Sequence, residues 1–252
     1  MPSLPGSVHI APDTETLFDA LGESLMSAAL GAVEQRGVFH LALSGGGTPE
    51  PFYVRLVTDP KFRGIPWKQT HVWIVDERRV PEDDEKANIR MLREALLDHV
   101  TTPAKQVHAM PVLADDPAGQ YEQQLLRAFD LGADVTGFNP PSLDWVLLGM
   151  GGDCHTASLF PESPALEVRD RWIVTNDGES VTPPPRLTMT YPLLNAAREV
   201  VVLAVGAGKR EALQRVADQH DSGSPDVTNI PISGIDPEGS LTWFLDQAAA
   251  GS

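Results

Sequence analysis

Cysteine is nearly absent from this chain, and long apolar runs are missing altogether. Cys154 is the single cysteine among 252 residues, which excludes an internal disulfide and any cysteine-rich metal centre. No apolar run reaches the ~20 residues that a transmembrane helix needs. The opening segment, MPSLPGSVHI, has neither the basic nor the apolar part of a secretory signal. We therefore expect a soluble protein that works in the cytoplasm.

Positive charge is also scarce. The chain has 19 lysines and arginines and 35 aspartates and glutamates, which gives a net charge of −16. This charge argues against nucleic acids and anionic membranes as partners. The histidines outside the motifs below show no ligand spacing with one another, so we expect no metal site. The sequence shows no internal repeat, low-complexity tract or dividing linker. We expect residues 1–252 to form one domain.

Segments with the pattern of strands alternate with segments with the pattern of helices. The expected strands cover residues 38–43, 72–75, 145–148 and 200–205, where apolar residues run almost without interruption. The expected helices run from a cap at Asp13 to Arg36, from Thr48 through Val57, from Ile89 to about Thr101, from Asp116-Pro117 through Phe129, and through GAGKREALQRV. Such alternation predicts βαβ units and an α/β fold with a mainly parallel sheet.

The most informative stretch is WVLLGMGGDCHTASLFP, which starts at Trp145. Its buried strand ends in three glycines, and Asp153 and His155 follow two residues apart. Open α/β sheets bind ligands at the carboxyl ends of their strands. A lone histidine here would more often cap the backbone, but an acid, an imidazole and three glycines together predict a functional site.

A glycine-rich loop after one strand and cationic residues near other strands predict an anion site. Ser44, Gly45, Gly46, Gly47 and Thr48 lie between a strand and a helix, where free amides and a helix N-terminus favour negative charge. Thr48 is expected to cap that helix. The loop lacks the signatures of ATP and dinucleotide sites. Arg78 and Lys209 follow other apolar strands, and Arg186 follows three prolines that stiffen its approach. All three could hold a phosphate.

These motifs, in this order, resemble the 6-phosphogluconolactonase family. The resemblance rests on the blocks SGGGTPEPFY, VWIVDERRVP with Asn88-Ile89-Arg90, LLGMGGDCHTASLFP, PPPRLTMT, VGAGKREAL and the ending LTWFLDQAAA. It implies a Rossmann-like, doubly wound fold and hydrolysis of 6-phospho-D-glucono-1,5-lactone to 6-phosphogluconate in the oxidative pentose phosphate pathway. It implies no metal or organic cofactor. Cys154 stands where the family usually has glycine, and Ala87 where it often has serine.

The chemistry of a lactone then suggests a role for each residue. Neutral His155 is the best candidate for the base that activates water, and Asp153 would either orient His155 or bind sugar hydroxyls. Backbone amides of the GMGGD turn could stabilise the oxyanion. The phosphate would be bound by Ser44, Gly45, Gly46, Thr48, Arg78, Arg186 and Lys209. Asp76 and Asn88 would bind sugar hydroxyls or hold the loops, whereas Arg79 could be a surface residue.

Several alternatives stay open. An amino-sugar-phosphate deaminase or isomerase has a similar Asp-Gly-His turn, but an Asn-Glu-Pro follows its histidine where this chain has Leu159-Phe160-Pro161. A non-catalytic sugar-phosphate sensor would not need His155. A Cys154–His155 nucleophile pair is disfavoured because adjacent side chains point in different directions. Ser158 lacks the surroundings of a hydrolase nucleophile, so packing or helix capping is its expected role.

Overall fold

The computed structural model describes residues 3–131, 139–177 and 185–251. Its centre is a sheet with the spatial order β1-β10-β9-β6-β2-β3-β5. These strands are β1 (Ser7–Ala11), β2 (Phe39–Leu43), β3 (Thr70–Ile74), β5 (Val107–His108), β6 (Trp145–Gly149), β9 (Glu199–Ala204) and β10 (Ser240–Asp246). Neighbouring strands of this sheet pair in parallel. The predicted α/β fold with a mainly parallel sheet is therefore confirmed.

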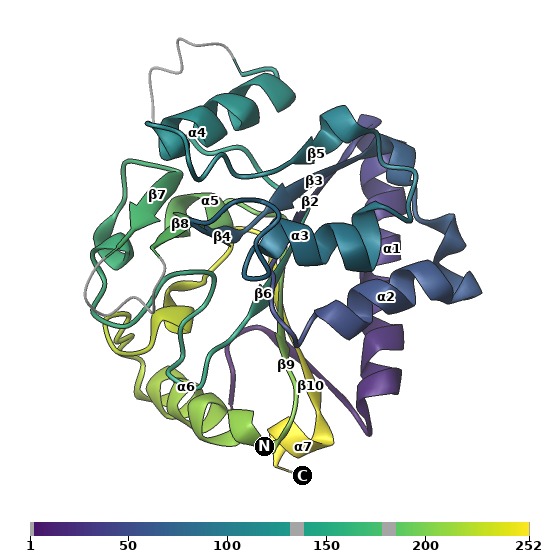
Figure 1. The fold of residues 1–252 in the computed structure, drawn as a ribbon. Helices are drawn as coiled ribbons and strands as arrows, with labels where there is room; N and C mark the ends of the chain where they lie inside the picture. Colours follow the sequence, from purple (N-terminus) through teal and green to yellow (C-terminus); the bar gives the residue numbers. More distant parts are fainter. Residues whose placement is uncertain (1–2, 132–138, 178–184, 252) are drawn as a thin grey trace.

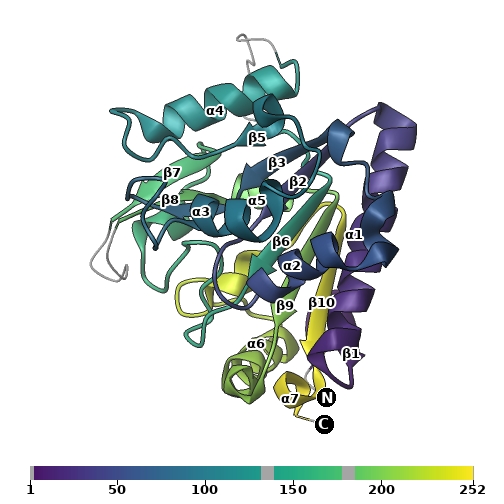
Figure 2. The same cartoon turned by 45° about the vertical axis from the view of Figure 1, so that its right-hand side comes forward.

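Helices cover both faces of this sheet. The α-helices are α1 (Thr14–Arg36), α2 (Glu50–Thr58), α3 (Asn88–Leu92), α4 (Pro117–Ala128), α5 (Tyr191–Asn195), α6 (Arg210–Ser222) and α7 (Gln247–Ala250). A π-helical turn over Arg93–Leu97 extends α3. Short 3₁₀ turns occupy Pro60–Gly64, Trp67–Gln69, Ala104–Gln106, Pro164–Glu167, Ala207–Lys209 and Pro231–Gly234. Helices α1 and α2 lie on one side of the sheet and α6 lies on the other (Figures 1 and 2).

The ends of the longer helices follow from identifiable caps. Asp13 accepts the Thr16 amide at 2.7 Å and begins α1, and Gly37 ends it at a φ of 76°, as predicted. The expected cap at Thr48 is wrong. Helix α2 begins at Glu50 after Pro49, and no side chain caps it, because Pro49 already has helical backbone angles and its carbonyl accepts the Tyr53 amide.

A second, antiparallel sheet was not predicted. It has the order β4-β8-β7, with β4 at Asp76–Arg78, β8 at Arg186–Met189 and β7 at Ile173–Asn176. This sheet lies beside the carboxyl ends of the central strands (Figure 1). The sequence TPPPR, which starts at Thr182, is typical of a turn between elements, but Thr182, Pro183 and Pro184 lie outside the described residues.

The order of the strands places the two glycine-rich turns together. Strand β2 lies between β3 and β6. The chain first adds β3 and β5 on one side of β2 and later adds β6 on the other side. Ligands of open α/β sheets bind at such a switch point, outside the carboxyl ends of the strands. The loop from Ser44 and the turn from Gly149 both start there.

The buried residues form one apolar cluster that reaches from Leu4 to Ala250. His40, in β2, is buried within the protein and accepts the Trp73 indole N–H at 3.2 Å. The burial of His40 and this contact are those of a structural histidine. Among the described residues, no helix is both long and apolar enough to span a membrane.

Candidate active site

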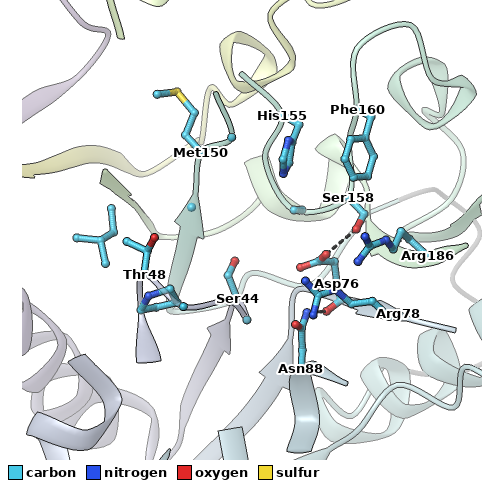
Figure 3. Close-up of a pocket in the computed structure, with 18 of the residues that line it drawn as sticks. Ser44, Thr48, Asp76, Arg78, Asn88, Met150, His155, Ser158, Phe160 and Arg186 are labelled. Carbon is cyan, nitrogen blue, oxygen red and sulfur yellow. Dashed lines mark hydrogen bonds between the residues drawn. The ribbon is translucent and has the colours of Figure 1, made fainter. Parts of the chain in front are cut away.

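A cavity of about 380 Å³ opens at the carboxyl ends of β2, β6 and β9 and beside β4 (Figure 3). His155 and all the residues predicted to bind substrate line it. Those residues are Ser44, Gly45, Gly46, Thr48, Asp76, Arg78, Asn88, Arg186 and Lys209. The fold thus brings together residues that are up to 165 positions apart (209 − 44). Asp153 does not line the cavity, but its carboxylate contacts His155, which does.

A tight turn after β6 presents His155 to the cavity. The Gly151 amide donates to the His155 carbonyl at 2.9 Å, and the Cys154 amide donates to the Gly151 carbonyl at 3.1 Å. The Thr156 hydroxyl closes the turn on the Gly149 carbonyl at 2.8 Å. A Cβ on Gly151 would overlap the side chains of His155 and Asp153. Glycine is required at this position because the catalytic candidates lie directly over its backbone.

Asp153 is hydrogen-bonded to the ring of His155. Its Oδ1 lies 2.6 Å from His155 Nδ1, so an Nδ1–H donor leaves Nε2 as the basic nitrogen. The hydrogen bond from His155 lowers the pKa of the Asp153 carboxyl to about 2. Because this folded-state pKa is depressed, the stabilisation is complete above the ordinary value of 3.8 and disappears as the pH falls through about 2. Of the two predicted roles for Asp153, this geometry supports orientation.

Cys154 points away from the cavity. Its side chain is fully buried, and its Sγ lies 3.7 Å from the Ala212 carbonyl on α6. Burial raises the pKa of the thiol, which keeps it protonated at neutral pH. The backbone φ at Cys154 is 69°, in the left-handed region where glycine is the usual residue. These observations argue against a Cys154–His155 nucleophile pair.

Cys154→Gly should retain activity and nearly all stability. Relief of the left-handed conformation favours glycine by about 1–2 kcal/mol, whereas loss of a small buried side chain and greater freedom of the unfolded chain oppose it by a similar amount. We expect kcat/KM within about twofold of wild type and a free energy of unfolding within about 1 kcal/mol. Thermal unfolding and steady-state kinetics measure both. A folded variant without turnover would show that the thiol takes part in the chemistry.

Two arginines from neighbouring strands also line the cavity (Figure 3). Arg78 on β4 is the direct cross-strand partner of Arg186 on β8. Burial, and secondly the charge of Arg78, lowers the pKa of Arg186. Its guanidinium lies 5.9 Å from the centre of the Phe160 ring. Two like charges across a strand pair repel each other, so an anion between them would relieve the repulsion.

The glycine loop and Lys209 complete the positively polarised part of the cavity. Gly46 has a φ of 103°, which lets the loop turn back over the end of β2. Lys209 Nζ donates to the Met150 carbonyl at 2.6 Å, so the lysine also holds the turn that carries His155. The Ser44 hydroxyl donates to the Leu147 carbonyl at 2.8 Å, which ties the loop to β6.

Sequence reasoning missed the role of Ser158. Ser158 is buried, at 1% exposure, as a packing role requires, but it also lines the cavity, and its hydroxyl donates to Asp76 Oδ2 at 2.5 Å. The Asn88 side chain donates to the Asp76 carbonyl at 2.6 Å. Two buried atoms, Arg78 Nε and Asn88 Oδ1, have no hydrogen-bond partner among the described residues. Ser158 could have been noticed as a polar residue three positions after His155, between apolar neighbours.

Phe160 and Met150 also line the cavity without having been predicted to do so. The Phe160 ring centre lies 4.6 Å from that of His155, so an apolar surface flanks the imidazole. Arg79 does not line the cavity; its Nε donates to the Val112 carbonyl at 3.0 Å. Over the described part of the chain, no group of three or more His, Cys, Asp or Glu residues could hold a metal ion.

Comparison with known proteins agrees with this architecture. The chain is 40% identical over 246 residues to a 6-phosphogluconolactonase of Nostoc sp., covering 96% of each chain. It is 36% identical over 247 residues to that of Mycobacterium tuberculosis, covering 97% of each. The crystal structure of 6-phosphogluconolactonase from Leishmania guyanensis superposes with a TM-score of 0.82 at 29% identity, covering 97% of both chains.

A family model described as glucosamine-6-phosphate isomerases/6-phosphogluconolactonase matches residues 12–243. This range contains every residue that lines the cavity. It also includes the central strands from β2 to β9, whose ends form the site. The chain belongs to the glucosamine-6-phosphate isomerase/6-phosphogluconolactonase family.

Proposed function

We propose that this chain hydrolyses 6-phospho-D-glucono-1,5-lactone to 6-phosphogluconate, with His155 as the general base. The observation that carries the proposal is the hydrogen-bonded His155–Asp153 pair, whose histidine lines the same cavity as Arg78 and Arg186. The pair supplies a base, and the arginines supply a site for a phosphate. The names of the relatives support the same activity.

His155 would act first as a base and then as an acid. Nε2 takes a proton from water as its oxygen attacks the lactone carbonyl, and Asp153 stabilises the resulting imidazolium. When the tetrahedral intermediate collapses, the bond from C1 to the ring oxygen breaks and His155 returns the proton to that oxygen. The product is an open-chain acid, and the enzyme regains its starting protonation state.

The geometry of the turn limits which backbone amides can stabilise the oxyanion. The Gly151 amide already donates to the His155 carbonyl, so we assign no oxyanion contact to it. We assign the oxyanion contact to one or more of the other backbone amides of residues 149–153, which belong to the turn that carries His155. Asp76, fixed by Ser158, would accept a hydrogen bond from a sugar hydroxyl.

A direct assay tests the proposed reaction. Freshly prepared 6-phosphogluconolactone is mixed with the purified protein, and acid release is compared with the spontaneous rate in the same buffer. We expect a clear acceleration that is proportional to protein concentration. No acceleration over buffer would contradict the proposed function.

The main alternative is an amino-sugar-phosphate deaminase or isomerase. In that group an Asn-Glu-Pro places a carboxylate near the turn, whereas Phe160 here places an apolar ring 4.6 Å from His155. We therefore expect no ammonia release from glucosamine 6-phosphate under conditions that give lactone hydrolysis. Ligand binding without turnover of either substrate would instead favour a sugar-phosphate sensor.

Asp153→Asn should lower kcat more than it raises KM. An amide can accept or donate, so it no longer enforces the Nδ1–H form of His155. Part of the ~10²–10⁴-fold contribution of an acid–base group is then lost, and we expect kcat to fall about 10- to 100-fold. Steady-state kinetics at pH 7 measure the effect. An unchanged kcat would mean that Asp153 does not act through His155.

A further inference from the structure

Glu77 lies between two site residues in β4 but does not line the cavity. Asp76 and Arg78 do line it, and successive residues of a strand point to opposite faces. The cross-strand partner of Glu77 is the buried Leu187. Glu77 itself is only 1% exposed. A carboxylate is rarely buried to this extent unless hydrogen bonds or an opposite charge replace its contacts with water.

Three backbone amides surround the Glu77 carboxylate. Oε1 accepts the amides of Arg78 and Asn88, each at 2.7 Å, and Oε2 accepts the Ile89 amide at 2.8 Å. Asn88 and Ile89 begin α3, whose N-cap residue, Ala87, supplies no side-chain bond. Glu77 therefore caps α3 from a distance and fastens it to β4.

These bonds extend to the cavity through two side chains. The Asn88 side chain donates to the Asp76 carbonyl and packs so closely on Gly45 that a Cβ there would overlap it. Arg78 Nη1 donates to the Lys86 carbonyl at 2.6 Å, in the segment that α3 follows. The Glu77 carboxylate thus joins β4, the start of α3 and the glycine loop.

We propose that Glu77 is a positioning residue, whose carboxylate holds Arg78 and Asn88 in the geometry that binds a phosphorylated sugar acid. Glu77 does not touch the ligand. The identity of the ligand rests on the proposed function, whereas the positioning role concerns any phosphate-bearing anion in this cavity.

The direction of the effect separates positioning from simple electrostatics. Glu77→Gln removes a negative charge near Arg78 and Arg186, which by Coulomb's law alone would tighten anion binding. Positioning predicts the opposite, because the amide must turn its NH₂ group toward at least one backbone N–H. We expect Kd for 6-phosphogluconate, measured by calorimetry at pH 8, to rise about 5- to 20-fold, as for the loss of one to two hydrogen bonds.

The pH dependence gives a second readout. Burial raises the pKa of the Glu77 carboxyl to about 7, and a protonated carboxyl resembles the amide of glutamine, with one acceptor and one donor. The charged or titratable groups that interact with it are Asp76 and Arg78 on β4, Arg186 on β8 and Tyr121 on α4. The ratio of variant to wild-type Kd should be largest at pH 8 and approach one near pH 5.5.

Asp144→Asn is the matched control. Asp144 is also a buried carboxylate that accepts a backbone amide, that of His40 at 2.7 Å, but it precedes β6 at the end opposite the cavity. The Asp144→Asn substitution should leave the Kd for 6-phosphogluconate unchanged. Glu77→Asp, which keeps the charge but shortens the side chain, is the second variant and should weaken binding as Glu77→Gln does.

Three outcomes would overturn the positioning role. They are a Kd for the Glu77 variants within twofold of wild type or tighter, an equal loss in Asp144→Asn, and a Kd ratio that is constant with pH. Inorganic phosphate serves as a second probe. Because binding is read without turnover, a protein that fails to hydrolyse the lactone but shows the expected losses of binding would contradict the proposed function alone.

Discussion

His155→Ala should lower turnover of 6-phosphogluconolactone by about two to four orders of magnitude, the usual contribution of a positioned acid–base group. The imidazole is held by Asp153 at 2.6 Å and faces a cavity whose cationic residues lie on other elements. Binding of the product 6-phosphogluconate should therefore change by less than about threefold, since its phosphate contacts remain. Steady-state kinetics, corrected for spontaneous hydrolysis, and calorimetry measure the two effects.

His220→Ala is the control for this experiment. His220 is an exposed residue in the last turn of α6 and does not line the cavity. It should retain wild-type turnover and binding. If His155→Ala keeps near-wild-type turnover, His155 is not the base, and Asp76, whose carboxylate is held by Ser158, becomes the candidate.

The parallel sheet was predictable because its strands carry strong local signals. Residues 39–43 and 145–148 are buried throughout, so both segments are apolar apart from His40 and have the pattern of buried parallel strands. Helix α1 has an aspartate cap and a terminal glycine, and both signals act within a few residues of the helix ends. The ends of these strands then located two parts of the site, because parallel strands bring their carboxyl ends to one edge.

The antiparallel sheet could not be predicted in the same way. Strand β4 is the charged segment Asp76–Arg78, which has no apolar pattern and is stabilised by pairing with β8, more than 100 residues later. Its neighbours in the sequence carry no information on that pairing. Tertiary contacts of this kind override local propensity.

The site residues were found from their chemistry, but not the contacts between them. Asp153 and His155 are close in sequence, yet only the turn geometry favours orientation over sugar binding. Ser158 and Glu77 were missed because their roles depend on Asp76 and on Asn88, respectively. A hydroxyl or a carboxylate gives no sequence signal of which distant amide or carboxylate it will meet.

The second large effect should follow from Arg186→Ala. Its guanidinium lies against Phe160 and opposite Arg78, and a hydrogen bond to a charged group contributes about 1.5–3 kcal/mol. We expect kcat/KM for the phosphorylated lactone to fall about 10- to 100-fold. Lys209→Ala should act in the same direction, since Lys209 lines the cavity and also holds the Met150 carbonyl.

A comparison of two substrates tests the assignment of the phosphate site directly. Unphosphorylated gluconolactone should be a poor substrate for the wild type, because it lacks the contacts that position its ring, and Arg186→Ala should change its hydrolysis little. Added salt should weaken binding of 6-phosphogluconate to the wild type. Arg63→Ala, at an exposed residue outside the cavity, controls for the loss of one positive charge. If the wild type hydrolysed both lactones equally well, or if Arg63→Ala matched Arg186→Ala, the phosphate would bind elsewhere.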